Sequence, residues 1–248
     1  MKRILKWMGT GRFLLAVSVT TMSAWTTPMP VFAGLSPEAR CESRKEKALG
    51  NRAVCRARQR SEAAKGRPTN FDRCETQFRK AIAAADKGAA RKGTRCRWKV
   101  SPVGTARDLD TGLEWTLPVD GFSVRSRNRT FQWSREEGSG TDGSLFTVFL
   151  TTLNRRVGFL GADPTCFAGH CDWRIPSLDE FSSIFYTCGS ELNCEEPQPV
   201  LDQSVYYWTS SRQNSEASFM VRVPVANFSY DVLLFTTQAH AVAVRGEE

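Results

Sequence analysis

The chain has 248 residues, of which 41% are hydrophobic and 24% are charged, and its formal net charge is +8. After residue 33 no stretch is apolar enough to predict a membrane-spanning helix. The remaining length suits one domain of ordinary size with a smaller one beside it. His170 and His240 are the only histidines, so the sequence offers few candidates for a histidine that acts as a general acid or base.

Residues 1–33 have the three-part plan of a secretory signal, with a basic start, an apolar run over 13–25 and a polar end. Val31-Phe32-Ala33 places small residues where signal peptidase reads them, which predicts cleavage between Ala33 and Gly34. The apolar run is shorter than the ~20 residues of a spanning helix, which favours a cleaved signal over a retained anchor. We therefore expect an exported protein: periplasmic, cell-surface or secreted.

All eight cysteines follow residue 33, and an even number of cysteines in an exported chain predicts disulfides. Zinc binding is the alternative, but the closest cysteine pairs lack the two-residue spacing of structural zinc sites. We expect no metal and four disulfides, namely Cys41–Cys96, Cys55–Cys74, Cys166–Cys171 and Cys188–Cys194.

Charge divides the chain into two parts. Residues 34–100 hold 19 Lys and Arg against 7 acids, a net charge of +12, whereas residues 101–248 hold 11 Arg, no Lys and 19 acids, a net charge of −8. So abrupt a change in composition indicates a domain boundary. The predicted organisation is a signal peptide over 1–33, a basic helical hairpin over 34–100 and a second domain over 101–248.

The basic part has the signals of two helices. Ser36 and Pro37 are a favoured pair at a helix start and predict a first helix that runs to about Ala64. Thr69 and Asp72 form a T-x-x-D start for the second helix. Its apolar residues recur at three- and four-residue steps on one face: Phe71, Cys74, Phe78, Ile82 and Ala85. Antiparallel packing of the two helices would bring their cysteines together as two nested disulfides.

Cations gather near the predicted hairpin tip, namely Arg52, Arg56, Arg58, Arg60, Lys65 and Arg67. One interpretation is the solvated face of a spacer. The other is a binding site for a polyanion, whose sulfate or phosphate groups long cations can reach. Export makes nucleic acid an unsuitable partner, so a lipopolysaccharide, an acidic polysaccharide or a sulfated glycan fits better.

Residues 101–248 read as short strands and two helices, which predicts an α+β domain. Asp110-Thr111-Gly112 marks a tight reversal, and an apolar stripe over 145–157, opened by Asp142 or Ser144, predicts a helix. Ser177-Leu178-Asp179-Glu180 is a capping box for a second helix. The strands expected near the end of the chain span 217–223, 230–236 and 239–245.

Several motifs occur in the order of a known family. They are Asp110-Thr111-Gly112-Leu113-x-Trp115, Phe146-Thr147-x-Phe149-Leu150, Leu153-Asn154, Phe167-Ala168-Gly169-His170-x-Asp172-Trp173-Arg174-Ile175-Pro176, Glu180-Phe181, Tyr207-Trp208-Thr209-Ser210-Ser211 and Val244-Arg245-Gly246. Residues 105–246 thus resemble the DUF1566 family, or Lcl C-terminal domain, named after a collagen-like adhesin. The resemblance implies a C-type-lectin-like arrangement, adhesion, sulfated glycosaminoglycan ligands and trimers. This chain has no collagen-like repeat, and its basic surface lies in the hairpin instead.

The motif residues are expected to have structural roles: Asp110, Gly112, Trp115, Asp172, Trp173, Arg174, Pro176, Trp208 and Arg245. Trp115, Trp133, Trp173 and Trp208 have flat faces that suit sugar rings, but core positions are favoured. We expect Arg174 and Arg245 to pair with acids such as Asp172 or Glu180.

Two groups of residues are candidates for calcium binding, Glu196-Pro197-Gln198 and the set of Asp108, Asp110 and Glu114, but neither supplies the six to eight oxygens that calcium needs. A Ser177–His170–Asp172 triad lacks a nucleophile elbow. We therefore expect no enzyme activity and no cofactor. The favoured function is a binding or adhesion module of the cell envelope for a glycan or other polyanion. The alternative is a structural or assembly protein whose helical hairpin docks another protein or copies of itself as a homo-oligomer. A hydrolase that uses His170 is a third.

Overall fold

The computed structural model describes residues 35–136, 140–155, 166–186, 201, 205–212, 217–222 and 229–246. Residues from Leu35 onward form one compact unit. The predicted signal peptide, the predicted Cys188–Cys194 bond and the Glu196-Pro197-Gln198 motif lie outside the described residues.

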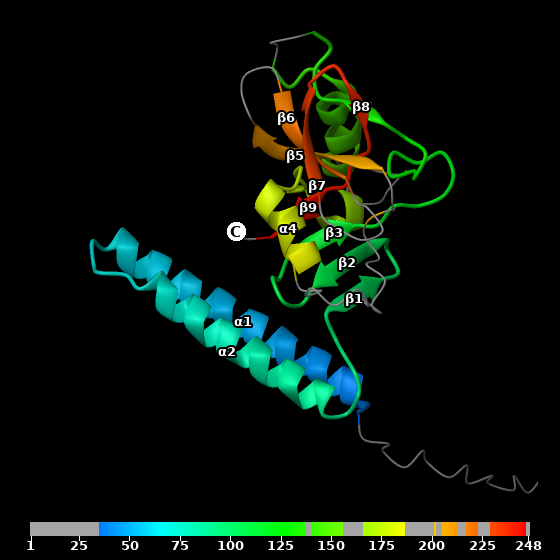
Figure 1. The fold of residues 1–248 in the computed structure, drawn as a ribbon. Helices are drawn as coiled ribbons and strands as arrows, with labels where there is room; N and C mark the ends of the chain where they lie inside the picture. The colour runs from blue at the N-terminus through cyan, green and yellow to red at the C-terminus, as the bar shows by residue number, and fades with distance from the viewer. Residues whose placement is uncertain are drawn as a thin grey trace, which may run out of the picture. The chain divides into compact units, whose positions relative to one another are not determined.

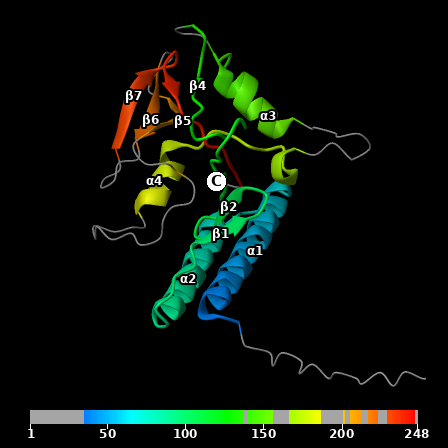
Figure 2. The ribbon, with the colours of Figure 1, turned by 90° about the vertical axis from the view of Figure 1, so that its right-hand side faces the viewer.

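Two long helices, α1 (Pro37–Ala64) and α2 (Phe71–Ala90), form the hairpin, and they lie side by side along their length (Figures 1 and 2). The predicted start of α1 is confirmed, because the Ser36 hydroxyl accepts a hydrogen bond from the backbone N–H of Ala39 at 3.1 Å. Two of the predicted disulfides are present as a nested pair. Cys41–Cys96 links the beginning of α1 to the segment after α2, and Cys55–Cys74 links the two helices to each other.

The start of α2 differs from the prediction. Asn70, not Thr69, is the capping residue, and its side chain accepts a hydrogen bond from the backbone N–H of Arg73 at 2.9 Å. The helix begins at Phe71, so Arg73 is its third residue, which is the N–H that a capping side chain can reach. Asp72 then lies inside the first turn, where its negative charge interacts favourably with the positive end of the helix dipole.

One antiparallel sheet joins the two ends of the C-terminal domain (Figure 1). Its order is β1 (Trp98–Ser101), β2 (Thr105–Asp108), β3 (Glu114–Thr116) and β9 (Val244–Arg245). The predicted reversal between β2 and β3 is confirmed, and Gly112 has the positive φ of +85° that this turn requires.

A second antiparallel sheet has the order β5 (Tyr206–Arg212), β6 (Ala217–Arg222) and β7 (Ser229–Leu234). It confirms two of the predicted strands. The third predicted strand, 239–245, is not continuous. It contains the last residue of β8 (Gln238–Ala239) and the whole of β9. β8 pairs with β4 (Phe131–Gln132). The sequence did not predict β5 as a strand, because its residues do not alternate cleanly and the register shifts between Trp208 and Arg212.

The described helices of the domain are η1 (Leu145–Leu150), α3 (Thr151–Asn154), η2 (Phe167–Gly169) and α4 (Leu178–Tyr186). The predicted stripe over 145–157 is helical as far as Asn154. Ser144 occupies the position directly before it, as expected, but its side chain makes no capping hydrogen bond. Ser144 accepts a hydrogen bond from the Gln132 backbone and Asp142 bonds the Ser134 hydroxyl, so both hold the β4 segment in place. The capping box of α4 is confirmed, since Ser177 and Glu180 bond each other's backbone N–H.

The four tryptophans whose faces would suit sugar rings lie in the core, as expected. Trp115 packs with Phe181 beneath α4, while Trp133, Trp173 and Trp208 belong to a second apolar cluster with Phe149. A third cluster joins the hairpin to the domain and consists of Ala48, Leu49, Phe78, Ile82 and Leu109. The hairpin therefore shares a core with the turn that follows β2.

Candidate functional site

The predicted cluster of cations at the hairpin tip is in large part engaged within the protein. Arg52 and Arg56 both bind the carboxylate of Glu75 on α2, with nitrogen–oxygen distances of 2.9 and 3.0 Å. Burial alone would raise the pKa of Glu75, but hydrogen bonds and charge from Arg52 and Arg56 outweigh it and hold that pKa below its ordinary value. These two arginines tie α1 to α2.

Arg52 also reaches the C-terminal domain. It donates a hydrogen bond to the Thr111 carbonyl at 2.9 Å, and its guanidinium lies 4.8 Å from the centre of the Phe78 ring. At the far end of the hairpin, Lys65 and Arg67 bind Glu62 at 3.2 and 2.9 Å. The remaining two cations of the predicted cluster, Arg58 and Arg60, are exposed.

Lys45 is a buried cation that the sequence analysis missed. Its side chain is 1% exposed, and its ammonium binds Asp86 of α2 at 2.6 Å and also Asp110 of the β2–β3 turn. Burial raises the pKa of Asp110, although the Lys45 ammonium opposes that shift. The signal was present in the helical spacing, because Lys45 is four residues from both Cys41 and Leu49 and shares their buried face.

Gly112 explains how the hairpin approaches the turn so closely. A Cβ atom at this position would lie 2.7 Å from the Leu49 Cδ2 atom, which is closer than carbon atoms approach. The glycine thus meets two needs at once, a positive φ and close packing against α1.

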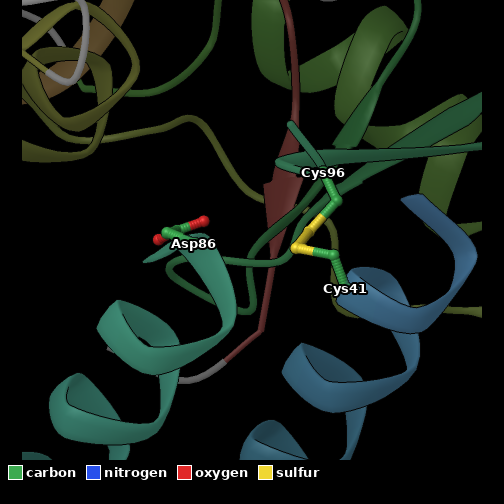
Figure 3. Close-up of side chains that lie close together, drawn as sticks. All are labelled: Cys41, Asp86 and Cys96. Carbon is green, nitrogen blue, oxygen red and sulfur yellow. A yellow bond between two sulfur atoms is a disulfide. The ribbon is translucent and has the colours of Figure 1, made fainter. Parts of the chain in front are cut away.

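Cys41, Cys96 and Asp86 lie together and offer ligand atoms within 4.8 Å of one another (Figure 3). The two sulfur atoms are bonded to each other as a disulfide, so neither is the thiolate that binds a metal. Asp86 is held by Lys45. The cluster therefore consists of a disulfide beside a Lys45–Asp86 ion pair, and these groups do not form a metal site.

Three acids considered for calcium each bind a cation of the chain itself. Asp108 forms a buried pair with Arg97 at 2.9 Å, Asp110 binds Lys45, and Glu114 binds Arg245 at 2.8 Å. Arg97 also donates to the carbonyls of Ser183 and Ile184 in α4, and so links that helix to the first sheet. These carboxylates are already neutralised by pairing.

The family motifs converge at the end of the first sheet. Arg245 binds Glu114 and also Asp172 at 2.9 Å, and the His170 ring lies 4.0 Å from Glu114. Burial disfavours both charged groups, but their pairing lowers the pKa of Asp172 and raises that of Arg245. The expected pairing of Arg245 is confirmed, as is that of Arg174, which binds Glu180 at 2.6 Å.

The hypothetical triad is not arranged for catalysis. The Ser177 hydroxyl accepts a hydrogen bond from the Glu180 N–H, and the Asp172 carboxylate bonds Arg245. The third predicted disulfide, Cys166–Cys171, is present and holds the loop that carries His170. A serine used as a cap and an aspartate held by an arginine do not supply a nucleophile–base pair.

A family model for the Lcl C-terminal domain matches residues 104–245. The chain belongs to the Lcl C-terminal domain family. No curated protein matches the chain. The Lcl C-terminal domain begins within the β1–β2 turn, so both hairpin helices lie outside the matched residues. Within the described part of the chain, no helix is long and apolar enough to cross a membrane.

Proposed function

We propose that this protein is a non-catalytic, extracytoplasmic binding or adhesion module whose basic hairpin takes a polyanionic glycan or envelope polysaccharide. The separation of charge on the hairpin carries the proposal. Glu75 binds Arg52 and Asp86 binds Lys45, and these two cations also contact the C-terminal domain. Exposed cations elsewhere on the helices make no salt bridge with any described residue: Arg44, Lys47, Arg58, Arg73, Arg79, Lys80, Lys87 and Arg91.

The hairpin is a rigid support for these cations. Two disulfides join α1 to α2 and to the segment after it, and Lys45, Arg52 and Leu49 fix the hairpin on the β2–β3 turn. A preorganised surface loses little conformational entropy when a ligand binds. The disulfides also support export, because such bonds persist in oxidising compartments.

The Lcl C-terminal domain serves in this proposal as the folded body that carries the hairpin, with a C-type-lectin-like arrangement. Two features support that arrangement. β3 pairs with β9, so the beginning and the end of the domain share one sheet. A separate three-stranded sheet, β5–β7, lies between them in the sequence.

A glycan array probed with residues 35–248 tests the proposal. We expect acidic glycans to bind and neutral glycans of the same backbone to give no signal, because the attraction is electrostatic. Binding should also weaken as salt rises, because counterions screen exposed charges. Equal binding to neutral and acidic glycans, or binding that does not depend on salt, would overturn the proposal.

Assembly through protein contacts is the second candidate, and one observation favours it. β7 is an edge strand among the described residues, and its outward positions Tyr230, Val232 and Leu234 are exposed. An apolar edge can accept a strand from another chain. A dimer or larger species in light scattering, lost in Val232→Lys, would support assembly, whereas a monomer at all concentrations would remove it.

A further inference from the structure

Three exposed cations of α2 and Arg91, the residue that follows its last turn, form one row. Arg73, Lys80, Lys87 and Arg91 follow one another at steps of seven, seven and four residues. With 3.6 residues per turn, these steps return to nearly the same side of the helix. At 1.5 Å per residue the row is about 27 Å long.

The row points away from the rest of the protein. The buried residues of α2 are on its opposite side, namely Cys74, Phe78, Ile82, Ala85 and Ala89, and they face α1 and Leu109. The acids of this helix, Asp72, Glu75 and Asp86, lie off the row. None of the four cations makes a salt bridge with a residue in the described part of the chain.

Arg44 of α1 widens the row. Its Nη1 atom would lie 3.1 Å from a Cβ atom placed on Gly88, so the guanidinium lies against α2 at this glycine. Gly88 and Ala84 are the small residues among the cations.

We propose that a linear acidic polysaccharide binds lengthwise along this row, with its repeated sulfate or carboxylate groups at Arg73, Lys80, Lys87 and Arg91. The inference rests on the proposed function and locates its site on the side of α2 and not at the hairpin tip. A ligand with charges spaced along its length matches cations spaced along a helix.

Two other polyanions fit less well. An anionic membrane would require bulky apolar residues beside the cations, whereas Ala84 and Gly88 occupy those positions. The three disulfides of the described residues favour an oxidising compartment, whereas the nucleic acid of a cell is held mainly in the reducing cytosol or nucleus.

The test compares two variants of residues 35–248 that lose the same charge. The row variant is Arg73→Gln, Lys80→Gln, Lys87→Gln and Arg91→Gln. The tip variant is Arg58→Gln, Arg60→Gln, Lys65→Gln and Arg67→Gln. The probes are dextran sulfate and polygalacturonate, with neutral dextran as the blank. We expect the row variant to bind on the order of tenfold more weakly and with a smaller salt dependence, and the tip variant to change little.

Equal loss in both variants, or wild-type affinity in the row variant, would overturn this inference and leave the proposed function standing. No binding of either acidic polymer by the wild type would instead contradict the proposed function. Tighter binding to duplex DNA or to phosphatidylglycerol vesicles would overturn the ligand class. Should the row variant lose helical circular dichroism, the milder pair Lys80→Glu and Lys87→Glu decides the question by the same comparison.

Discussion

Single ion pairs decide how the hairpin sits on the C-terminal domain. Lys45 binds one carboxylate on α2 and one on the β2–β3 turn, so one side chain connects three segments. The pairs of Arg174 and Arg245 could be predicted, because their acids Glu180 and Asp172 also belong to the series of family motifs. Lys45 and Arg97 were missed, because Lys45 binds Asp110, 65 residues away, and Arg97 binds Asp108, which lies 11 residues further on at the end of β2.

Lys45→Ala should lower the free energy of unfolding by about 3 kcal/mol, because it leaves two carboxylates, one of them largely buried, without their cation. Lys47→Ala is the matched control, an exposed lysine of the same helix, and should change stability by less than about 0.5 kcal/mol. Urea unfolding measures both. Similar effects of the two substitutions would contradict the role of Lys45.

Gly112→Ala and Gly66→Ala separate backbone strain from steric contact. Both glycines have a positive φ, +85° and +70°, but only Gly112 lies against Leu49. We expect a loss of about 1 kcal/mol at Gly66 and about 2–3 kcal/mol at Gly112 in chemical unfolding. Adding Leu49→Ala to Gly112→Ala should cost less than the sum of the two, and strict additivity would rule out the contact.

Glu75 should make the hairpin sensitive to acid. Because Arg52 and Arg56 lower its pKa, its contribution to stability is present above the ordinary value of 4.5 and is lost as the pH falls through the folded pKa. The melting temperature of Glu75→Gln should therefore lie below that of the wild type near pH 7, and the gap should close toward pH 3. A gap that stays constant over this range would contradict the pairing.

The helices of the hairpin were well predicted because their signals are local. Ser36 and Pro37 mark one end, the apolar spacing of α2 marks its buried face, and helix geometry implies the nested disulfides. The cap of α2 was misplaced by one residue because Thr69 and Asn70 are both good capping residues. β5 was missed because Tyr207, Trp208 and Thr209 are buried in succession, so its first half does not alternate between buried and exposed residues.

At the level of these elements, the disulfides should contribute unequally. Cys41–Cys96 closes 55 residues and Cys55–Cys74 closes 19, so the first restricts the unfolded chain more. We expect replacement of both cysteines by serine to cost about 4 kcal/mol for the first pair and about 3 kcal/mol for the second, measured in guanidinium. A larger loss from the second pair would show that local packing outweighs chain entropy.

The whole molecule combines a basic part, net +12 over residues 34–100, which contains the hairpin, with an acidic part, net −8 over residues 101–248, which contains the Lcl C-terminal domain. The sequence predicted this division of charge, and the structure adds that the parts share an apolar cluster through Leu109. It could not predict that contact, because Leu109 is distant in sequence from Leu49 and Ile82. Nor did net charge reveal which cations are paired and which face solvent.

The most direct measurement of the proposed function is the affinity of residues 35–248 for dextran sulfate as a function of salt concentration, with neutral dextran alongside. Binding through several exposed cations predicts that the logarithm of the association constant falls linearly with the logarithm of the salt concentration, while neutral dextran stays unbound. An affinity independent of salt, or equal affinity for the two polymers, would contradict polyanion binding by the hairpin.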